Sequence, residues 1–446
     1  MINPPSQRPP LEKRNFSSPA IESCIRDLSS RIGDPELAWM FSNCFPNTLD
    51  TTVIHSENSE APDTFLITGD IPAMWLRDSA AQIHPYIRFT PEDPHLKNLI
   101  AGVLNRQARC IHLDPYANAF YQDPVLGEWK DDNTLMLPGV HERKWELDSL
   151  CYFLRLSNEF HSVAGLHACY GPNWLSAVEK VLHVFREQQS YNDSYTFSRL
   201  TDCKNGTQDL LGRGTPSREC GLIRSAFRPS DDATLFPFLV PSNAMASYEL
   251  NRVARLCELV APESSLAQEC QQLSEEISVA LRNHAITNDS EGNPFLAYEV
   301  DGFGSQAIMD DANIPSLLAL PYLGCLSADD PLYRATRGII LSEDNPYFFR
   351  GKAGEGIGGP HVGLDFIWPM SVIMRALTSE SEDEILTCLR QLRSTHAGTG
   401  FMHESYHKDS PENFTRPWFG WVNSLFGELI LHLDQNHPDL LKHPLA

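Results

Sequence analysis

Apolar residues recur at intervals of three and four along most of the chain, and this spacing predicts amphipathic helices. In one stretch Met245, Val253 and Leu256 share a face, and Ser242 after Pro241 is predicted to be the N-cap. The pattern predicts roughly a dozen helices in all. Comparable stretches are Ile21–Leu28, Leu96–Val103, Val178–Phe185, Leu266–Leu281, Ile314–Tyr322, Ile367–Leu377, Ile385–Leu392 and Trp418–Leu433.

Strands are predicted only at Thr52–His55, Thr64–Thr68 and Phe295–Glu299, enough for minor β-hairpins. Loops rich in Gly, Pro, Asn and Asp, such as 351–360 and 204–219, separate the helices. Neither a linker nor an internal repeat divides the chain. A dozen helices in one unit favour an all-α (α/α)6 barrel, a toroid of six helical hairpins. In such a fold, long loops at one end build the site.

The first residues are polar and rich in proline, and they lack the apolar run of a signal peptide. We therefore predict a flexible arm over residues 1–17 and a single catalytic domain over residues 18–446. No window is apolar over the ~20 residues that a membrane span needs. The 11 cysteines include no Cys-x-x-Cys pair. Together these features predict a reduced, cytoplasmic protein with no membrane partner.

The chain is strongly acidic, with a formal net charge of -23 from 58 Asp and Glu against 35 Lys and Arg. Binding to nucleic-acid phosphates needs a Lys/Arg surface, so the balance argues against a nucleic-acid partner. Sialylated or phosphorylated substrates are disfavoured for the same reason. A neutral substrate such as a sugar fits better.

Five clusters combine carboxylates, amides and aromatic rings, the groups that bind sugar hydroxyls and the apolar faces of sugar rings. Taken singly, each cluster has another explanation, because helix caps account for many Asp and Asn residues and core packing for many Trp residues. The clusters are Gly69–Ser79; Asp114–Asn118; Arg228–Ala233 with Pro241–Asn243; Glu299–Gly304 with Met309–Asn313; and Met402–His407 with Trp418 and Trp421.

The segment His403-Glu404-Ser405-Tyr406-His407 has the form of a zinc metallopeptidase motif. On a helix the two histidines would share a face and hold zinc, with Glu404 as general base and Glu428 as a possible third ligand. The surroundings argue against it. Glycines just upstream and the segment Asp409–Pro411 just downstream leave little room for the helix that such a site requires.

Several segments resemble the exo-α-1,6-mannosidases of glycoside hydrolase family 125. The resemblance runs from about residue 34 to about 434, and its motifs are long and specific. It implies an (α/α)6 barrel, an inverting mechanism, no metal or other cofactor, and a mannose-containing oligosaccharide or glycan as substrate. One departure is the Gly-rich stretch 353–363, where a more polar segment is expected and His361 alone corresponds. The matching segments are Gly69–Ser79, Tyr116–Asn118, Ser225–Asp232, Ile308–Leu318, Ile367–Pro369 and Met402–Ser405.

By resemblance, Asp231 matches the general acid of the family and Glu404 the general base. An inverting glycosidase needs two such carboxyls about 6.5–9.5 Å apart, with a water between them. The neighbouring Asp232 would raise the pKa of Asp231, as an acid catalyst requires. The residues themselves do not choose between the two aspartates; a structural role is expected for Asp232.

Arg77 and Asp78 are the leading candidates for contact with the terminal mannose. Further candidates are Trp75, Tyr116, Asn118, Arg228, Asn243, Asp301, His361 and His403. A non-catalytic mannan-binding protein on the same barrel is an alternative, and the presence of both carboxylates argues against it. A glycoside phosphorylase is also conceivable, although it would not need a base such as Glu404.

Overall fold

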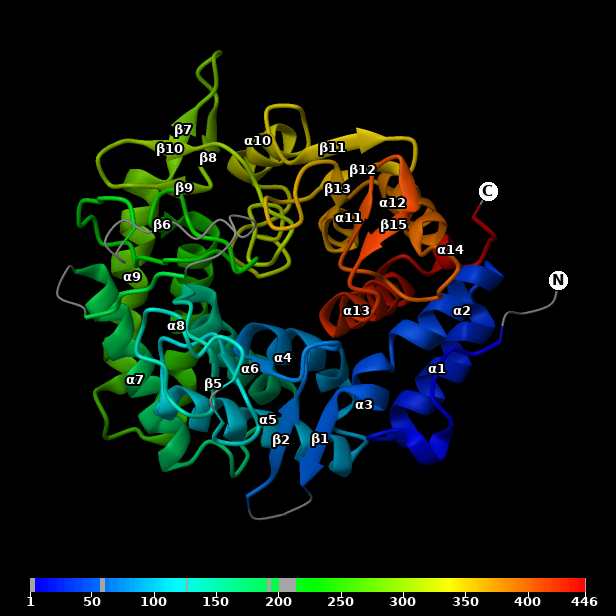
Figure 1. The fold of residues 1–446 in the computed structure, drawn as a ribbon, viewed down its shortest axis with the longest axis horizontal. Coiled ribbons are helices and arrows are strands. Elements are labelled where there is room, and N and C mark those ends of the chain that lie inside the picture. The colour runs from blue at the N-terminus through cyan, green and yellow to red at the C-terminus, as the bar shows by residue number, and fades with distance from the viewer. Residues whose placement is uncertain (1–4, 57–60, 126, 191–193, 200–213, 446) are drawn as a thin grey trace.

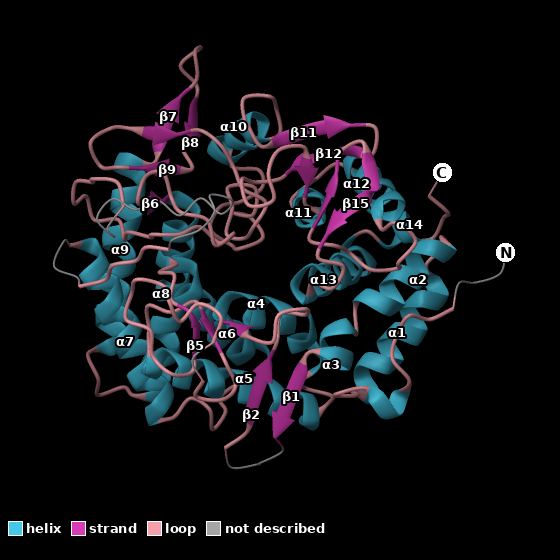
Figure 2. Ribbon diagram, viewed as in Figure 1, coloured by secondary structure: helices cyan, strands magenta, loops and turns pink. Residues whose placement is uncertain are grey.

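The computed structural model describes residues 5–56, 61–125, 127–190, 194–199 and 214–445. It is built mainly of helices, which short antiparallel strands connect (Figures 1 and 2). The helices are α1 (Pro19–Arg31), α2 (Pro35–Cys44), α3 (Asn47–Thr51), α4 (Leu76–Ile83), α5 (Pro94–Leu113), α6 (Leu147–Ala164), α7 (Pro172–Gln189), α8 (Val240–Val260), α9 (Leu266–His284), α10 (Pro331–Ile340), α11 (Pro369–Leu377), α12 (Glu382–Thr395), α13 (Gly420–Asn436) and α14 (Pro438–Leu441).

The strands form small antiparallel sheets of two or three strands. The hairpins are β1 (Val53–Ser56) with β2 (Asp63–Leu66), β7 (Ile286–Asn288) with β8 (Pro294–Leu296), and β11 (Phe348–Gly351) with β12 (Gly354–Ile357). The three-stranded sheets are β3 (Met74–Trp75), β4 (Ala119–Phe120) and β5 (Val140–Glu142); β10 (Gln306–Ala307), β9 (Glu299–Val300) and β6 (Phe238–Leu239); and β13 (Phe366–Ile367), β14 (Ser405–His407) and β15 (Ser410–Thr415).

The chain makes one circuit around the molecule, so its two ends lie near each other (Figure 1). Along the inside of this circuit α13 packs against α4, α4 against α6, and α6 against α8, while α11 packs against α13. We call α4, α6, α8, α11 and α13 the inner helices. Others lie outside them, as α9 does on α8 and α12 on α11. Near the two ends, the Gly33 amide donates to the Leu441 carbonyl at 2.7 Å.

The inner helices begin differently from the outer ones. Four outer helices start at a side chain that caps a backbone N–H, from Ser18, Asp34, Asp93 and Ser381. The inner helices instead follow an extended residue without a side-chain cap; for α8 this is Leu239, at the end of β6. The predicted cap Ser242 therefore lies inside α8, because strand pairing rather than a polar side chain fixes where the helix begins.

The predicted helix around Ile314–Tyr322 is wrong, because this segment folds into successive turns. Its apolar residues are buried by neighbouring elements instead of by a helical face. Asp310 accepts hydrogen bonds from the amides of Leu317 and Leu318 at 2.8 and 3.0 Å. The loop predicted over 351–360 is also partly wrong, since β11 and β12 form a hairpin there. Residues 204–213 of the other predicted loop lie outside the described part of the chain.

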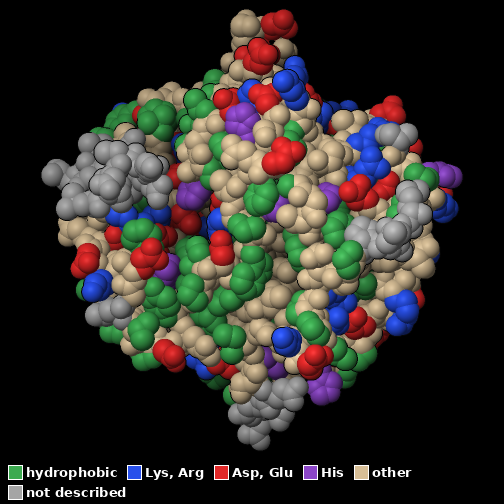
Figure 3. All heavy atoms as spheres, turned by 45° about the vertical axis from the view of Figure 1, so that its right-hand side comes forward, with side chains coloured by type: hydrophobic (Ala, Val, Ile, Leu, Met, Phe, Trp, Pro, Cys, Tyr) green, Lys and Arg blue, Asp and Glu red, His purple; other side chains and the backbone are tan. Residues whose placement is uncertain are grey.

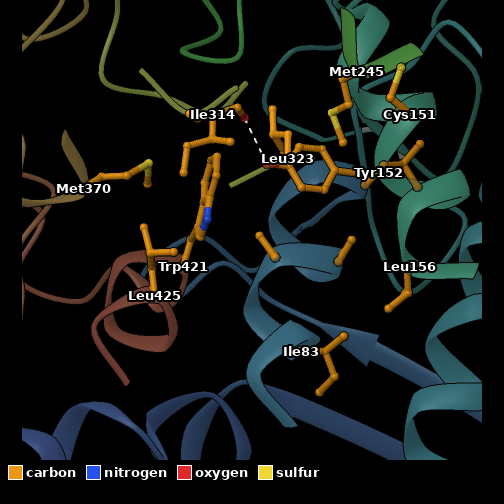
Figure 4. Packing of buried hydrophobic residues seen from close by; sticks show 14 of the residues in the cluster. Ile83, Cys151, Tyr152, Leu156, Met245, Ile314, Leu323, Met370, Trp421 and Leu425 are labelled. Carbon is orange, nitrogen blue, oxygen red and sulfur yellow. Dashed lines mark hydrogen bonds between the residues drawn. The ribbon is translucent and has the colours of Figure 1, made fainter. Parts of the chain in front are cut away.

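Most buried apolar side chains form one extensive cluster that runs from Ile21 to Leu445 in the sequence, and Ala73, Trp75 and Ala119 form a small second one. Figure 4 shows its centre, where Trp421 of α13 lies close to Ile314 of the turn segment. The Tyr152 hydroxyl of α6 donates to the Ile314 carbonyl at 3.1 Å. The turn segment is thus held between the inner helices by burial and by a hydrogen bond.

The predicted flexible arm is corrected from residue 5 onwards, because residues 5–17 are held against α1–α3. Arg8 lies between two carboxylates and donates from Nε to Asp50 at 2.8 Å and from Nη1 to Glu22 at 3.0 Å. The amides of Asn15 and Phe16 donate to backbone carbonyls at residues 50 and 49. Composition alone could not reveal these partners, which come from distant positions.

No helix in the described residues has the length and apolar character to cross a membrane. None of the cysteines that the structure describes forms a disulfide. On the face drawn in Figure 3, Lys and Arg side chains lie among Asp, Glu and apolar side chains.

We expect Arg8→Ala to lower the free energy of unfolding by about 3 kcal/mol, because among the described residues it leaves Arg14 as the cation beside the buried Asp50 carboxylate. Urea denaturation followed by circular dichroism would measure this. Arg26→Ala is the matched control; its side chain is 71% exposed, so the change should stay within about 0.5 kcal/mol. Equal stability of the two variants would show that Arg8 does not anchor the segment.

Candidate active site

A cavity of about 370 Å³ lies where four of the inner helices begin. Its walls come from the starts of α4, α11 and α13, from β5 and the segment that leads into α6, and from the loops around residues 230, 361 and 404. Helix N-termini carry partial positive charge, which favours carboxylates and other anions nearby. The lining residues are Thr68, Ile71, Trp75, Arg77, Asp78, Glu128, Trp129, His141, Glu142, Lys144, Arg199, Pro229, Ser230, Asp231, Asn313, His361, Val362, Trp368, Glu404, Arg416, Phe419 and Trp421.

Aromatic rings supply much of the apolar wall. The indole N–H groups of Trp75 and Trp368 are buried and have no hydrogen-bond partner among the described residues. Buried donors in a folded protein are nearly always satisfied, so an unpaired donor beside a cavity suits a hydroxyl-bearing ligand. Rings that offer both a flat apolar face and a free N–H fit the mixed surface of a sugar.

Arg77, in the first turn of α4, is the centre of a buried cluster of carboxylates. Its guanidinium donates to Glu146 at 2.6 Å and to Asp148 at 3.2 Å, both at the start of α6. It also donates to Asp231 at 2.9 Å and lies 3.4 Å from the Asp78 carboxylate. One cation therefore serves four carboxylates, three of them almost fully buried.

The charge imbalance appears in the pKa values. Burial is the largest cause that raises the pKa of Asp78 and of Asp148 to about 6, although Arg77 opposes it. Burial also raises the pKa of Glu146 well above its usual value, and Asp231 adds to this. For Asp231 burial acts in the same direction, but Arg77 and a hydrogen bond with Glu146 outweigh it and lower the pKa. A proton in this cluster is therefore held best by Glu146.

The two neighbouring aspartates of the loop before β6 face different surroundings. Asp231 lines the cavity and has a φ of 64°. Asp232 lies outside the cavity lining, where it contacts His361 Nδ1 at 3.2 Å and accepts a hydrogen bond from Ser230. Only Asp231 is thus placed to reach a ligand in the cavity, a choice that the sequence alone left open.

Glu404 enters the cavity from the segment just before β14. The Thr415 hydroxyl donates to its Oε2 at 2.8 Å, and Arg416 Nη1 lies 3.4 Å from its Oε1. Arg416 is itself paired with Asp70 through a 2.6 Å hydrogen bond from Nη2. Thr415 and Arg416 therefore hold the Glu404 carboxyl in place at the cavity wall.

His361 lies between the two carboxylate groups of the cavity wall. Burial acts to lower its pKa, but the hydrogen bond and charge of Asp232 outweigh this effect, and Glu404 and Asp231 act in the same direction. The resulting pKa of about 9 keeps the imidazole positively charged at neutral pH. The cavity therefore has a cationic donor on one side in addition to Arg77.

The family model for metal-independent alpha-mannosidases (GH125) matches residues 34–431. The chain belongs to this family. It is therefore a glycoside hydrolase, an α-mannosidase, and the motif resemblance drawn from the sequence is confirmed.

The similarity to known proteins extends over nearly the whole chain. The meiotically up-regulated gene 157 protein of Schizosaccharomyces pombe is 43% identical over 459 residues, which span 98% of this chain and 90% of that protein. A solved structure of a metal-independent α-mannosidase, a Streptococcus pneumoniae non-productive complex with alpha-1,6-mannobiose, matches with a TM-score of 0.91 and 38% identity and covers 95% of this chain and 100% of that chain. A bacterial glucoamylase complexed with acarbose matches with a TM-score of 0.55 and 12% identity, over 93% of this chain and 59% of that one, which shows the fold alone.

In this α-mannosidase the zinc-like motif is not helical, which corrects the metallopeptidase interpretation. Ser405–His407 form β14, so the two histidines do not share a helical face. His403 is buried and stacks on Phe414 with ring centroids 3.7 Å apart. Burial lowers its pKa to about 4. Among the described residues no group of three His, Cys, Asp or Glu side chains is arranged to hold a metal ion.

Several residues predicted to contact the sugar lie outside the cavity lining. The Tyr116 hydroxyl donates to Glu187 at 2.8 Å, and the Arg228 guanidinium pairs with Glu299 at 2.6 Å. Asn243 bonds the backbone of Ile223, and Asp301 accepts three amides of its own turn. Like His403, these side chains already have partners within the protein. The sequence does not distinguish a polar residue with such a structural partner from one that binds a ligand.

Asn118 has a different position from the one predicted. It is fully buried, and its amide group lies between the carboxylates of Glu142, Glu146 and Asp231 at 2.9, 3.1 and 3.4 Å. It therefore holds the acidic cluster in place behind the cavity wall, while Trp75, Arg77, Asp78 and His361 line the wall itself.

The sequence prediction missed Glu146 and the residues between 128 and 144 that line the cavity. The segment Val140–Leu147 reads as an ordinary polar stretch, although its Glu142 and Glu146 both contact the Asn118 amide beside Asp231. Arg416 also lines the cavity without having been predicted, whereas Trp421 was part of a predicted cluster and Trp368 part of a matching segment. The position of Arg416 beside Glu404 is the only sign of its role.

We expect Asp232→Asn to lower the pKa of His361 from about 9 towards or below 6.5, because the carboxylate is lost. Since the folded pKa lies above the unfolded one, the pair stabilises the protein fully below about pH 6.5 and loses this effect as the pH rises through 9. Histidine NMR titration would measure the pKa. Asp365→Asn, which removes an exposed carboxylate, is the control and should leave the pKa of His361 unchanged. An unchanged pKa of His361 in Asp232→Asn would refute the pairing.

Proposed function

We propose that this α-mannosidase is an inverting exo-enzyme that removes non-reducing terminal α-1,6-linked mannose from oligosaccharides or glycans. Asp231 is its general acid and Glu404 its general base. The observation that carries the proposal is that these two carboxylates, far apart in the sequence, line one cavity together with aromatic rings. Two carboxyls on opposite sides of a sugar are what inversion requires.

In the proposed reaction Asp231 gives a proton to the glycosidic oxygen as the bond from that oxygen to the anomeric carbon breaks. Water attacks the anomeric carbon from the opposite face and passes a proton to Glu404. The hydrogen bond from Thr415 and the contact with Arg416 hold Glu404 in position for this step. No step requires a metal ion, in keeping with the family.

The substrate class rests on two arguments. The Streptococcus pneumoniae relative was solved with alpha-1,6-mannobiose, and it is similar over nearly the full chain. A cavity of about 370 Å³ favours a terminal sugar over the interior of a long polysaccharide. We propose that Trp75, Arg77, Asp78 and His361 contact this sugar, since all four line the cavity.

We also propose that residues 18–446 form a single catalytic domain with the (α/α)6 arrangement. The inner helices pack on one another in sequence order and have outer partners, which supports this arrangement. In place of a sixth inner helix the circuit contains the turn segment 314–323, which packs between α6 and α13 (Figure 4). The same order places the starts of the inner helices together at one end, where the cavity lies.

We expect Asp231→Asn and Glu404→Gln each to reduce kcat on α-1,6-mannobiose by at least about 10²–10⁴-fold, because each removes a proton-transfer group. Proton NMR of the wild-type reaction should show β-mannose first, before mutarotation. Circular dichroism would establish that the variants are folded. Full activity in either variant would reject that assignment, and initial release of α-mannose would reject inversion.

A further inference from the structure

Glu146 lies directly behind the proposed acid and has no access to solvent. It precedes α6, and its Oε2 accepts from Arg77 at 2.6 Å and from the Ser149 hydroxyl at 3.1 Å. Its Oε1 accepts from the Asn118 amide at 3.1 Å. Arg77 and Asn118 also donate to Asp231 Oδ1, so the two carboxyls share both donors.

Glu146 and Asp231 lie side by side, because the Asn118 amide nitrogen is 3.1 Å from Glu146 Oε1 and 3.4 Å from Asp231 Oδ1. Two ionised carboxylates this close repel each other, which favours a state in which one of the two is protonated. Glu146 is the better place for the proton, because ionising a carboxyl that has no contact with solvent is costly. Asp231 is more easily ionised, since 21% of its side chain is exposed to the cavity. The pKa of Glu146 is raised and that of Asp231 lowered, in agreement with this assignment.

This arrangement creates a difficulty for Asp231 as a general acid. A carboxylate beside Arg77 is ionised in the empty enzyme, yet an acid catalyst must have a proton when the glycosidic bond breaks. The nearest stored proton is the one on Glu146. Other charged or titratable groups that act on this pair are Arg77, Asp78, His141, Glu142, Lys144, Asp148 and His361.

We infer that Glu146 is a positioning residue that stores the proton which Asp231 delivers to the glycosidic oxygen. This inference rests on the proposed function. As the leaving oxygen gains charge, Glu146 gives its proton to the Asp231 carboxylate, and Asp231 gives a proton to that oxygen. The bond between the sugar and the leaving oxygen breaks, water adds, and Glu404 takes one proton from that water. Release of this proton to solvent and uptake of another by the Glu146–Asp231 pair restore the resting enzyme.

The test compares Glu146→Gln and Asp231→Asn on two substrates. α-1,6-Mannobiose needs a protonated leaving oxygen, whereas 2,4-dinitrophenyl α-mannoside does not, because dinitrophenolate leaves as an anion. We expect Glu146→Gln to lower kcat on mannobiose by about 10²-fold, with KM little changed, and to leave the dinitrophenyl substrate nearly unaffected. The alkaline limb of its pH–kcat profile should move to lower pH, since Asp231 beside Arg77 would lose its proton earlier.

Glu249→Gln is the matched control. Glu249 is another fully buried glutamate paired with an arginine, Arg155, and it lies in α8 outside the cavity lining. Its substitution removes the same group and should not change the ratio of rates on the two substrates. Equal losses on both substrates in folded Glu146→Gln would assign Glu146 a structural role and overturn the proposal.

Failure of the proton store and failure of the proposed function give different results. A wild-type pH profile on mannobiose in Glu146→Gln, with Asp231→Asn inactive, rejects the store and keeps Asp231 as the acid. Full mannobiose activity in Asp231→Asn rejects the acid itself.

If Glu146→Gln does not fold, carbon-13 NMR of wild-type enzyme labelled at the glutamate carboxyls tests the proton store. One glutamate carboxyl should give the signal of a protonated group at neutral pH, and this signal should shift in Asp231→Asn but not in Glu249→Gln. Full ionisation of all glutamates would overturn the role of Glu146 as a proton store.

Discussion

The buried guanidinium of Arg77 is the interaction on which the site depends. It contacts four carboxylates from α4, from the start of α6 and from the loop at residue 231. A single cation does not neutralise four buried anions, so the cluster retains protons, and their distribution determines what Asp231 can do. Removing one partner of such a group leaves an uncompensated buried charge, which typically costs about 3–5 kcal/mol. The same contacts therefore join three parts of the fold and control the chemistry.

The geometry that brings these groups together comes from the way the inner helices begin. Trp75 and Trp368 are extended residues that directly precede α4 and α11, and both line the cavity. Short strands fix the direction of the chain at these points, so the first turns of several inner helices open into the same space. Partial positive charge at those turns favours the acidic side chains placed there.

The two proposed catalytic carboxylates are held in contrasting surroundings. Glu404 lies at the edge of a small sheet, where Thr415 and Arg416 donate to it. Asp231 is backed by a second carboxyl that competes for its proton. The proposed acid thus lies beside a stored proton, while hydrogen bonds at the edge of a sheet fix the proposed base; inversion needs one carboxyl in each role. The residues around Glu404 match a zinc-binding motif, but the two histidines of that motif share a face only on a helix. The local sequence therefore suggested a different chemistry from the one proposed for Glu404.

The sequence by itself determined most helices and the family, and by resemblance it predicted Asp231 and Glu404 as the catalytic pair, because apolar periodicity and long motifs are local properties of the chain. It did not determine that Ile314–Tyr322 folds into turns, since burial by other elements replaces a helical face there. Nor did it identify Glu146, and the residues without the family resemblance did not separate Asp231 from Asp232. Those distinctions depend on which side chains meet Arg77 and which meet His361, and such contacts between distant residues, together with burial, are decided only by the tertiary structure.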